Sequence, residues 1–179
     1  MTYYGAKQLA DSFRTVRKNT LAIAQELPED KYGFKAAPEV MSAGELLAHL
    51  AVSPMWHIDV HTKKMEQLDF AFFGMRTQQA KAEEQMLRSK AEIVRALTEN
   101  GETFAKFLEG LDEATLQSTV ALPPQSGASS KTRFEMILGA KEHEMHHRGQ
   151  LMLIQRLLGQ VPHLTRARQQ MQAQAAGRA

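Results

Sequence analysis

The chain has 179 residues, a formal net charge of +2 and no cysteine. A domain of this length buries roughly 70% of the surface that its unfolded chain exposes, so one domain with a substantial core is expected. The absence of thiols excludes disulfide scaffolds, thiolate zinc sites, iron–sulfur clusters and cysteine nucleophiles, so any metal must be held by histidines and carboxylates.

The composition favours an all-α protein, because Ala, Leu, Gln, Glu, Lys, Arg and Met dominate and these residues are strong helix formers. Four helical patterns follow along the chain. The first ends before Pro28, and steps of four and three residues place one set of side chains on a single face. That set is Leu9, Phe13, Val16, Thr20, Ile23 and Leu27.

The second pattern begins at Ser42 and continues to Val60. Ser42 and Glu45 have the spacing of a capping box, in which each side chain satisfies a backbone N–H at the start of a helix. Pro54 lies inside this pattern and removes one backbone hydrogen bond. We therefore expect a kink just beyond His49.

The third pattern runs from about residue 79 to 111, with apolar residues from Met86 to Leu111 in phase. The fourth opens at Thr132, which forms a second capping box with Glu135, and continues to Leu158 before Gly159 and Pro162. Residues 28–41 and 112–131 carry prolines and glycines and are predicted to be irregular loops.

These patterns predict a four-helix up-and-down bundle over residues 1–164. Residues 165–179 form a basic tail rich in Gln and Ala, predicted to be a frayed helix or disordered. The apolar segment 68–74 is expected to fold over an end of the bundle, beside the site.

His143 and His147 lie four residues apart on the stripe that carries the fourth helix's core residues. Burying two unpaired imidazoles there costs roughly 1–3 kcal/mol each. Residues at this spacing sit about 5–6 Å apart on one helix face, so both rings can bind one metal ion. The alternative is a pair of hydrogen-bonded core histidines.

The sequence around this pair also matches the H-E-x-x-H signature of zinc proteases, at residues 143–147. Such proteases take a third ligand from downstream, but no Asp or Glu follows Glu144 and only His163 remains beyond a proline. The metzincin extension fails as well, because Leu153 stands where its third histidine belongs. The protease reading is therefore disfavoured.

A third ligand is better sought upstream, at His49. This residue lies beside Leu46 and Leu50 on the buried side of the second helix. If the second and fourth helices run parallel, a stagger of roughly 6–12 Å brings His49 level with the other two histidines. The predicted metal site then lies between helices two and four.

Two motifs give the chain a resemblance to the DinB/YfiT-like metalloenzyme family. One is Glu45-Leu-Leu-Ala-His49-Leu in the second helix, and the other is His143-x-x-x-His147-Arg-Gly-Gln-Leu in the fourth. The resemblance extends from the first helix to about Gly159. It implies a four-helix bundle, a three-histidine site for nickel, zinc or a similar ion, and frequently a homodimer.

The resemblance implies either a metal-dependent transferase that activates a low-molecular-weight thiol or a hydrolase that activates water. Three neutral imidazoles leave a coordination position for either ligand, and the metal lowers the ligand's pKa. We therefore expect a metal-dependent enzyme with a small-molecule substrate. The alternative is a non-catalytic stress-response bundle with a structural metal.

Several other polar residues are candidates for a role at the site. Glu144 and Gln150 could orient ligands, and Glu144 could act as a base, although a solvated Glu144 is the simpler expectation. His57 and His61 also lie four apart, but neighbouring charged residues suggest a solvated side.

The first residues of the chain lack the features of a signal peptide, and no apolar run approaches the length of a membrane span. A cytoplasmic protein without a membrane partner is therefore expected. Nucleic-acid binding is not favoured, because the excess positive charge is confined to the tail.

Overall fold

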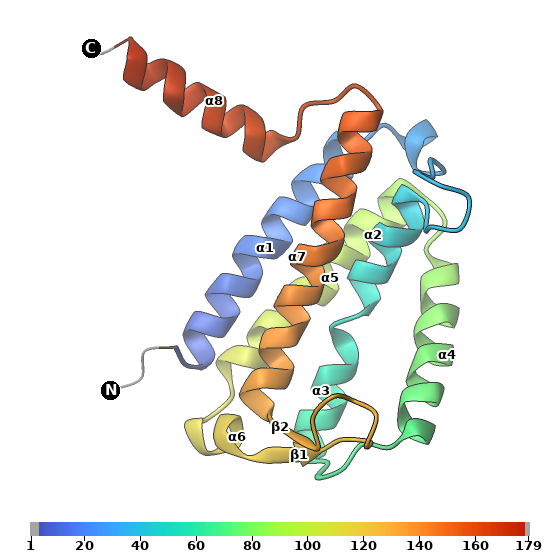
Figure 1. Cartoon of the computed structure of the whole chain (residues 1–179), viewed down its shortest axis with the longest axis vertical. Helices are drawn as coiled ribbons and strands as arrows, with labels where there is room; N and C mark the ends of the chain where they lie inside the picture. Colours follow the sequence, from blue (N-terminus) through green and yellow to red (C-terminus); the bar gives the residue numbers. More distant parts are fainter. Residues whose placement is uncertain (1–3, 178–179) are drawn as a thin grey trace.

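The computed structural model describes residues 4–177 and is mostly helical, which confirms the all-α expectation (Figure 1). The helices are α1 (Ala6–Glu26), the 3-10 turn η1 (Glu29–Lys31), α2 (Ala43–Val52), α3 (Met55–Thr62), α4 (Phe70–Met86), α5 (Lys90–Glu109), α6 (Glu113–Gln117), α7 (Arg133–Leu157) and α8 (His163–Ala176). One predicted loop instead contains a two-stranded antiparallel sheet, in which β1 (Thr119–Ala121) pairs with β2 (Ser130–Thr132).

Four of these helices enclose the core. Helix α1 packs against α5 and α7, and α2 packs against the same two helices. Helix α4 lies against α2 on the outside of this group, at the edge of the molecule (Figure 1). In the view of Figure 1, α1, α4 and α7 run upward, and α2, α3 and α5 run downward.

The core is built from the stripes that the sequence predicts. Every position of the α1 stripe, from Leu9 to Leu27, is buried. Phe13 meets Phe104 of α5 edge to face, with ring centroids 4.8 Å apart. Where α1 crosses α5, Gly101 leaves room for the side chain of Arg17, because a Cβ at this position would lie 2.9 Å from Arg17 Cγ.

Both predicted capping boxes form at the starts of their helices. The backbone N–H of Ser42 donates to Glu45 over 2.6 Å, and that of Thr132 donates to Glu135 over 2.7 Å. These contacts confirm where α2 and α7 begin, and they fix the phase of the two helices that carry His49, His143 and His147.

The second predicted helix is divided rather than kinked. Helix α2 ends at Val52 and α3 begins at Met55, with Pro54 between them. Pro54 has no N–H to donate, so it occupies the start of a new helix, where that hydrogen bond is not needed.

The prediction of one continuous third helix is wrong. The chain instead forms two helices, α4 and α5, with a break at residues 87–89. Ser89 caps α5 and forms a capping box with Glu92, which satisfies the first N–H groups of a new helix. Met86 is 72% exposed and does not belong to the core. The apolar segment 68–74 supplies the first turn of α4 rather than a loop.

The tail after Pro162 continues as helix α8, which projects from the body and buries none of its described residues (Figure 1). Its contacts with α1 include an ion pair between Arg166 and Glu26. Residues 178–179 of the predicted tail lie outside the described residues. No described helix is long and apolar enough to cross a membrane.

Candidate metal centre

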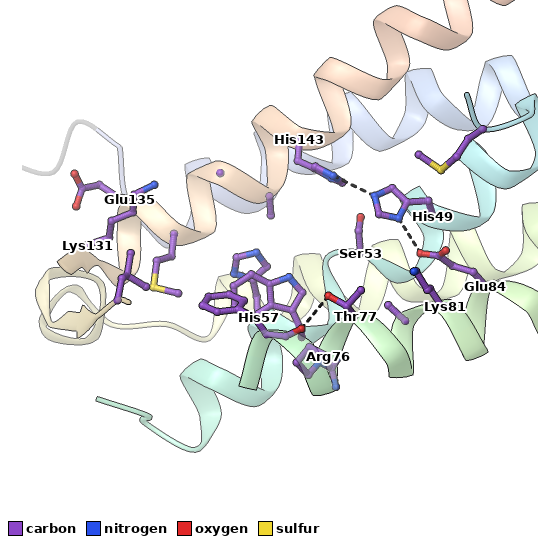
Figure 2. Close-up of a pocket in the computed structure, with 18 residues that line it drawn as sticks. His49, Ser53, His57, Arg76, Thr77, Lys81, Glu84, Lys131, Glu135 and His143 are labelled. Atoms are coloured by element: carbon purple, nitrogen blue, oxygen red, sulfur yellow. Dashed lines mark hydrogen bonds and ion pairs between the residues drawn. The ribbon is translucent and has the colours of Figure 1, made fainter. Parts of the chain in front are cut away.

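The three histidines singled out in the sequence come together at one point. His49 of α2 and His147 of α7 each place Nε2 at 3.1 Å from Nε2 of His143. All three atoms lie within 4.8 Å of one another, and the rings of His49 and His143 face each other in Figure 2.

The two shorter separations are close to those around a single divalent ion. Two nitrogens bound to a tetrahedral zinc-like ion at roughly 2.0–2.1 Å lie about 3.3 Å apart. The contacts of 3.1 Å are close to this value. Small ring movements would therefore bring all three nitrogens to bonding distance from one ion.

The outer nitrogens of two rings are fixed by acceptors. Nδ1 of His49 donates to Glu84 of α4 over 2.8 Å, and Nδ1 of His147 donates to Gln150 over 2.8 Å. A neutral imidazole carries one hydrogen, so Nε2 of both rings presents a lone pair. His143 can offer at most one hydrogen to these two lone pairs, whereas a cation would satisfy all three nitrogens.

Burial keeps the cluster neutral, which is the form that binds metals. Burial, together with the neighbouring His147 and His49, lowers the pKa of His143 to about 4. Burial also lowers the pKa of His147, against the opposing effect of its hydrogen bond with Gln150. Protons therefore compete weakly with a metal ion at these two residues.

Glu144 is neither solvated nor in contact with the histidines, contrary to both expectations. It is 2% exposed, and its carboxylate accepts from Nε and Nη2 of Arg17 in α1 at 2.9–3.1 Å. Arg17 also donates to the backbone carbonyls of Leu50 and Leu97, each over 2.8 Å. This pairing could not be predicted from local sequence patterns, because Arg17 and Glu144 lie on different helices.

Gln150 lies at the site as a contact of His147, in the place proposed from the sequence. Its amide nitrogen lies 3.3 Å from Nε2 of His146, which is consistent with the orientation that turns the amide oxygen toward His147. Glu84 was missed, since nothing local in the sequence connects a glutamate in α4 with a histidine in α2.

The prediction that His57 and His61 lie on a solvated side of their helix is wrong. His57 is 5% exposed and His61 is 2% exposed, because the division at Pro54 turns α3 into the core. Neither belongs to the three-histidine cluster. Nδ1 of His61 lies 3.1 Å from Nη1 of the buried Arg133.

A pocket of about 630 Å³ opens beside the cluster. Figure 2 shows His49, His143 and Glu84 at one end, Lys131 and Glu135 at the other, and His57 between them. Its walls are largely apolar, with α4 forming one side. This volume falls within the range of roughly 300–1,000 Å³ that is usual for small-molecule sites.

The relative direction of the two ligand-bearing helices differs from the expectation. Helices α2 and α7 run in opposite directions rather than parallel (Figure 1). The cause is the division of the third predicted helix, because α4 and α5 together add one reversal of the chain between α2 and α7.

Comparisons with known proteins agree with this fold. The family model described as DinB superfamily matches residues 12–151. The uncharacterized protein YjoA of Bacillus subtilis is 28% identical over 154 residues, which cover 86% of this chain and 91% of the relative. The crystal structure of the DinB-like protein YjoA gives a TM-score of 0.63 at 23% identity, covering 86% of this chain and 94% of that one.

Proposed function

Since the chain belongs to the DinB superfamily, we propose that His49, His143 and His147 hold one divalent metal ion and that the protein is a metal-dependent enzyme. The reaction class is transfer to a low-molecular-weight thiol or hydrolysis. The observation that carries the proposal is the convergence of three Nε2 atoms, two of them turned inward by Glu84 and Gln150.

The donor set indicates the kind of ion. Three imidazoles without a thiolate or carboxylate ligand suit zinc or nickel. When bound, such an ion supplies a coordination position at which water or a thiol becomes acidic near neutral pH. The pocket lies on the open side of His49 and His143, where a small-molecule substrate would be held.

The residues of the chain have separate roles in this proposal. His49, His143 and His147 bind the ion, while Glu84 and Gln150 hold two of the rings in one tautomer. The apolar pocket walls keep bulk water from the substrate. We further propose that the four core helices act as one bundle, that the protein forms a homodimer, and that nucleic acid is not a partner.

Metal analysis tests the proposal directly. We expect about one zinc or nickel ion per chain after native purification, and loss of the ion in His49→Ala, His143→Ala and His147→Ala. His163→Ala is the matched control, because His163 lies on α8 and pairs with Asn19. Stoichiometric metal that survives all three site substitutions would contradict the proposal.

The alternative function is a non-catalytic bundle with a structural metal. The supporting observation is that the ligands come from two different helices, so an ion would tie α2 to α7. In that case chelation lowers the melting temperature sharply, and a cobalt-substituted sample shows no spectral change with azide or a thiol. Binding of azide or a thiol to the cobalt form would instead support the enzyme.

A further inference from the structure

The pocket beside the histidine cluster has one buried polar residue in its apolar wall. Trp56, Phe73, Leu122 and Met136 supply much of the apolar lining. His57 lies among them and is 5% exposed. Its ring stacks on Trp56, with centroids 3.9 Å apart and an interplanar angle of 29°.

The two ring nitrogens of His57 have different surroundings. Nδ1 is buried and has no hydrogen-bond partner among the described residues. Nε2 is therefore the nitrogen that is left to face the pocket. Burial lowers the pKa of His57 to about 3, so the ring is neutral at pH 7 and carries a single hydrogen.

The surroundings of each buried histidine decide which nitrogen carries its hydrogen. Arg133 can only donate, so Nδ1 of His61 accepts and the hydrogen of His61 is on Nε2, which is buried without a partner. The rings of His57 and His61 are nearly parallel, with centroids 5.7 Å apart. Nδ1 of His57 is buried without an acceptor, so a hydrogen there would be unpaired, whereas a hydrogen on Nε2 faces the pocket and can be donated. The hydrogen of His57 is therefore assigned to Nε2.

The acidic side chains of the pocket lie at its two ends, away from the buried wall that holds His57 (Figure 2). Glu84 accepts from His49, and Glu135 accepts from the backbone and hydroxyl of Thr132. The hydroxyl of Thr77 donates to the carbonyl of Phe73. The polar group that the buried wall offers to a ligand is therefore a donor.

We propose that the pocket takes a substrate with an apolar body of aromatic size and a carbonyl-type oxygen, and that His57 donates a hydrogen bond from Nε2 to this oxygen. This inference rests on the proposed function in one respect, namely that the pocket is the substrate site of the metal centre. His57 is then a specificity-determining residue, and Trp56 and Phe73 hold the apolar body.

The sequence contains a single tryptophan, so the fluorescence of Trp56 reports directly on the pocket. The probes are benzylacetone and butylbenzene, which share one carbon skeleton and differ by the carbonyl oxygen. We expect saturable changes in fluorescence with both probes and tighter binding of benzylacetone. Phenylalanine at position 57 keeps the stacking and removes the donor, so His57→Phe should weaken benzylacetone about tenfold and leave butylbenzene unchanged.

Two further variants separate the hydrogen bond from packing. His57→Gln keeps a donor and should restore much of the affinity for benzylacetone, while His163→Phe on α8 should bind both probes as the unmodified chain does. Equal affinity of benzylacetone for the unmodified chain and His57→Phe would overturn the proposal. So would an equal loss for both probes, or the absence of saturable binding.

The same titrations with zinc-loaded and chelator-treated protein distinguish this inference from the proposed function. The pocket contacts come from side chains, so the effect of His57→Phe on benzylacetone should be present in both samples. If the protein holds no metal yet shows this effect, the proposed function fails and the binding preference stands. If metal is stoichiometric and the effect is missing, only the inference fails.

Discussion

At the scale of single residues, the behaviour of the candidate site depends on atoms that do not face the metal position. Glu84 and Gln150 each accept a hydrogen bond from the outer nitrogen of a histidine, over 2.8 Å in both cases. These bonds fix the tautomer and the orientation of His49 and His147. Their loss should therefore change metal affinity without removing a ligand.

Glu84→Gln should weaken metal binding by about 10- to 100-fold, because an amide accepts more weakly than a carboxylate and no longer offsets the ion's charge. Competition with a chromophoric chelator measures the change. Glu83→Gln is the matched control, since Glu83 is the preceding residue of α4 and is exposed. Equal affinities of the two variants would show that the contact with His49 does not matter.

Metal-free protein should lose stability as the pH falls, in part because His57 must stay neutral while buried. Burial lowers the pKa of His57 to about 3, below the value of about 6.5 in an unfolded chain. The contribution of His57 to stability is therefore complete above about pH 6.5 and is lost progressively as the pH falls toward about 3.

Urea unfolding between about pH 7 and about pH 4 in the presence of a chelator measures this dependence. His57→Phe should flatten the curve, because its side chain binds no proton in either state. His146→Phe, at an exposed position of α7, is the control. An unchanged slope in His57→Phe would mean that other groups cause the loss.

At the scale of secondary-structure elements, one buried ion pair links the four core helices. Arg17 of α1 contacts Glu144 of α7 and the carbonyls of Leu50 in α2 and Leu97 in α5. Leu50 follows His49 and Glu144 follows His143, so this pair sets the spacing of α2 and α7 close to the candidate ligands. The network satisfies its buried charges with direct hydrogen bonds.

Arg17→Met should destabilise the protein by about 3–5 kcal/mol, because it leaves a buried carboxylate and two carbonyls without their donor. Arg14→Met is the control on the same helix, since Arg14 pairs with Glu102 and Glu109 at the surface and should cost at most about 1 kcal/mol. Urea unfolding measures both changes.

Removing both charges should be less harmful than removing one. Arg17→Met combined with Glu144→Leu should recover part of the loss, because no uncompensated charge then remains in the core. If Arg17→Met costs no more than Arg14→Met, the buried pair does not hold the helices together.

At the scale of the whole molecule, the C-terminal helix α8 makes few contacts with the rest of the protein. Helix α8 contributes no buried residue, and it projects away from the core helices (Figure 1). Its polar contacts with α1 are those of Arg166 with Glu26 and of His163 with Asn19. The three-histidine cluster lies among α2, α4 and α7.

Deletion of residues 162–179 should therefore leave metal content unchanged and lower the melting temperature by at most a few degrees. Surface ion pairs contribute about 0–1 kcal/mol, and 1 kcal/mol corresponds to roughly 2–4 °C at this chain length. Metal analysis and thermal unfolding of the shortened chain check both expectations. A loss of metal would show that α8 supports the site.

The sequence by itself determined the features that depend on neighbours along the chain. The α1 stripe, the capping boxes at Ser42 and Thr132 and the shared face of His143 and His147 follow from helical periodicity and local hydrogen bonding. His49 was found because the residues downstream of Glu144 offered no suitable third ligand. Such features can be predicted from local patterns because the interacting residues are close in sequence.

Only the tertiary structure decided how these elements meet. The break before Ser89 reversed the direction of α7 relative to α2, although the hydrophobic phase continues across it. Glu84 contacts His49, Arg17 contacts Glu144, and His57 lies in the wall of the pocket. Each of these contacts joins residues from different helices or depends on how a helix faces its neighbours, so its energy comes from packing that no local pattern records.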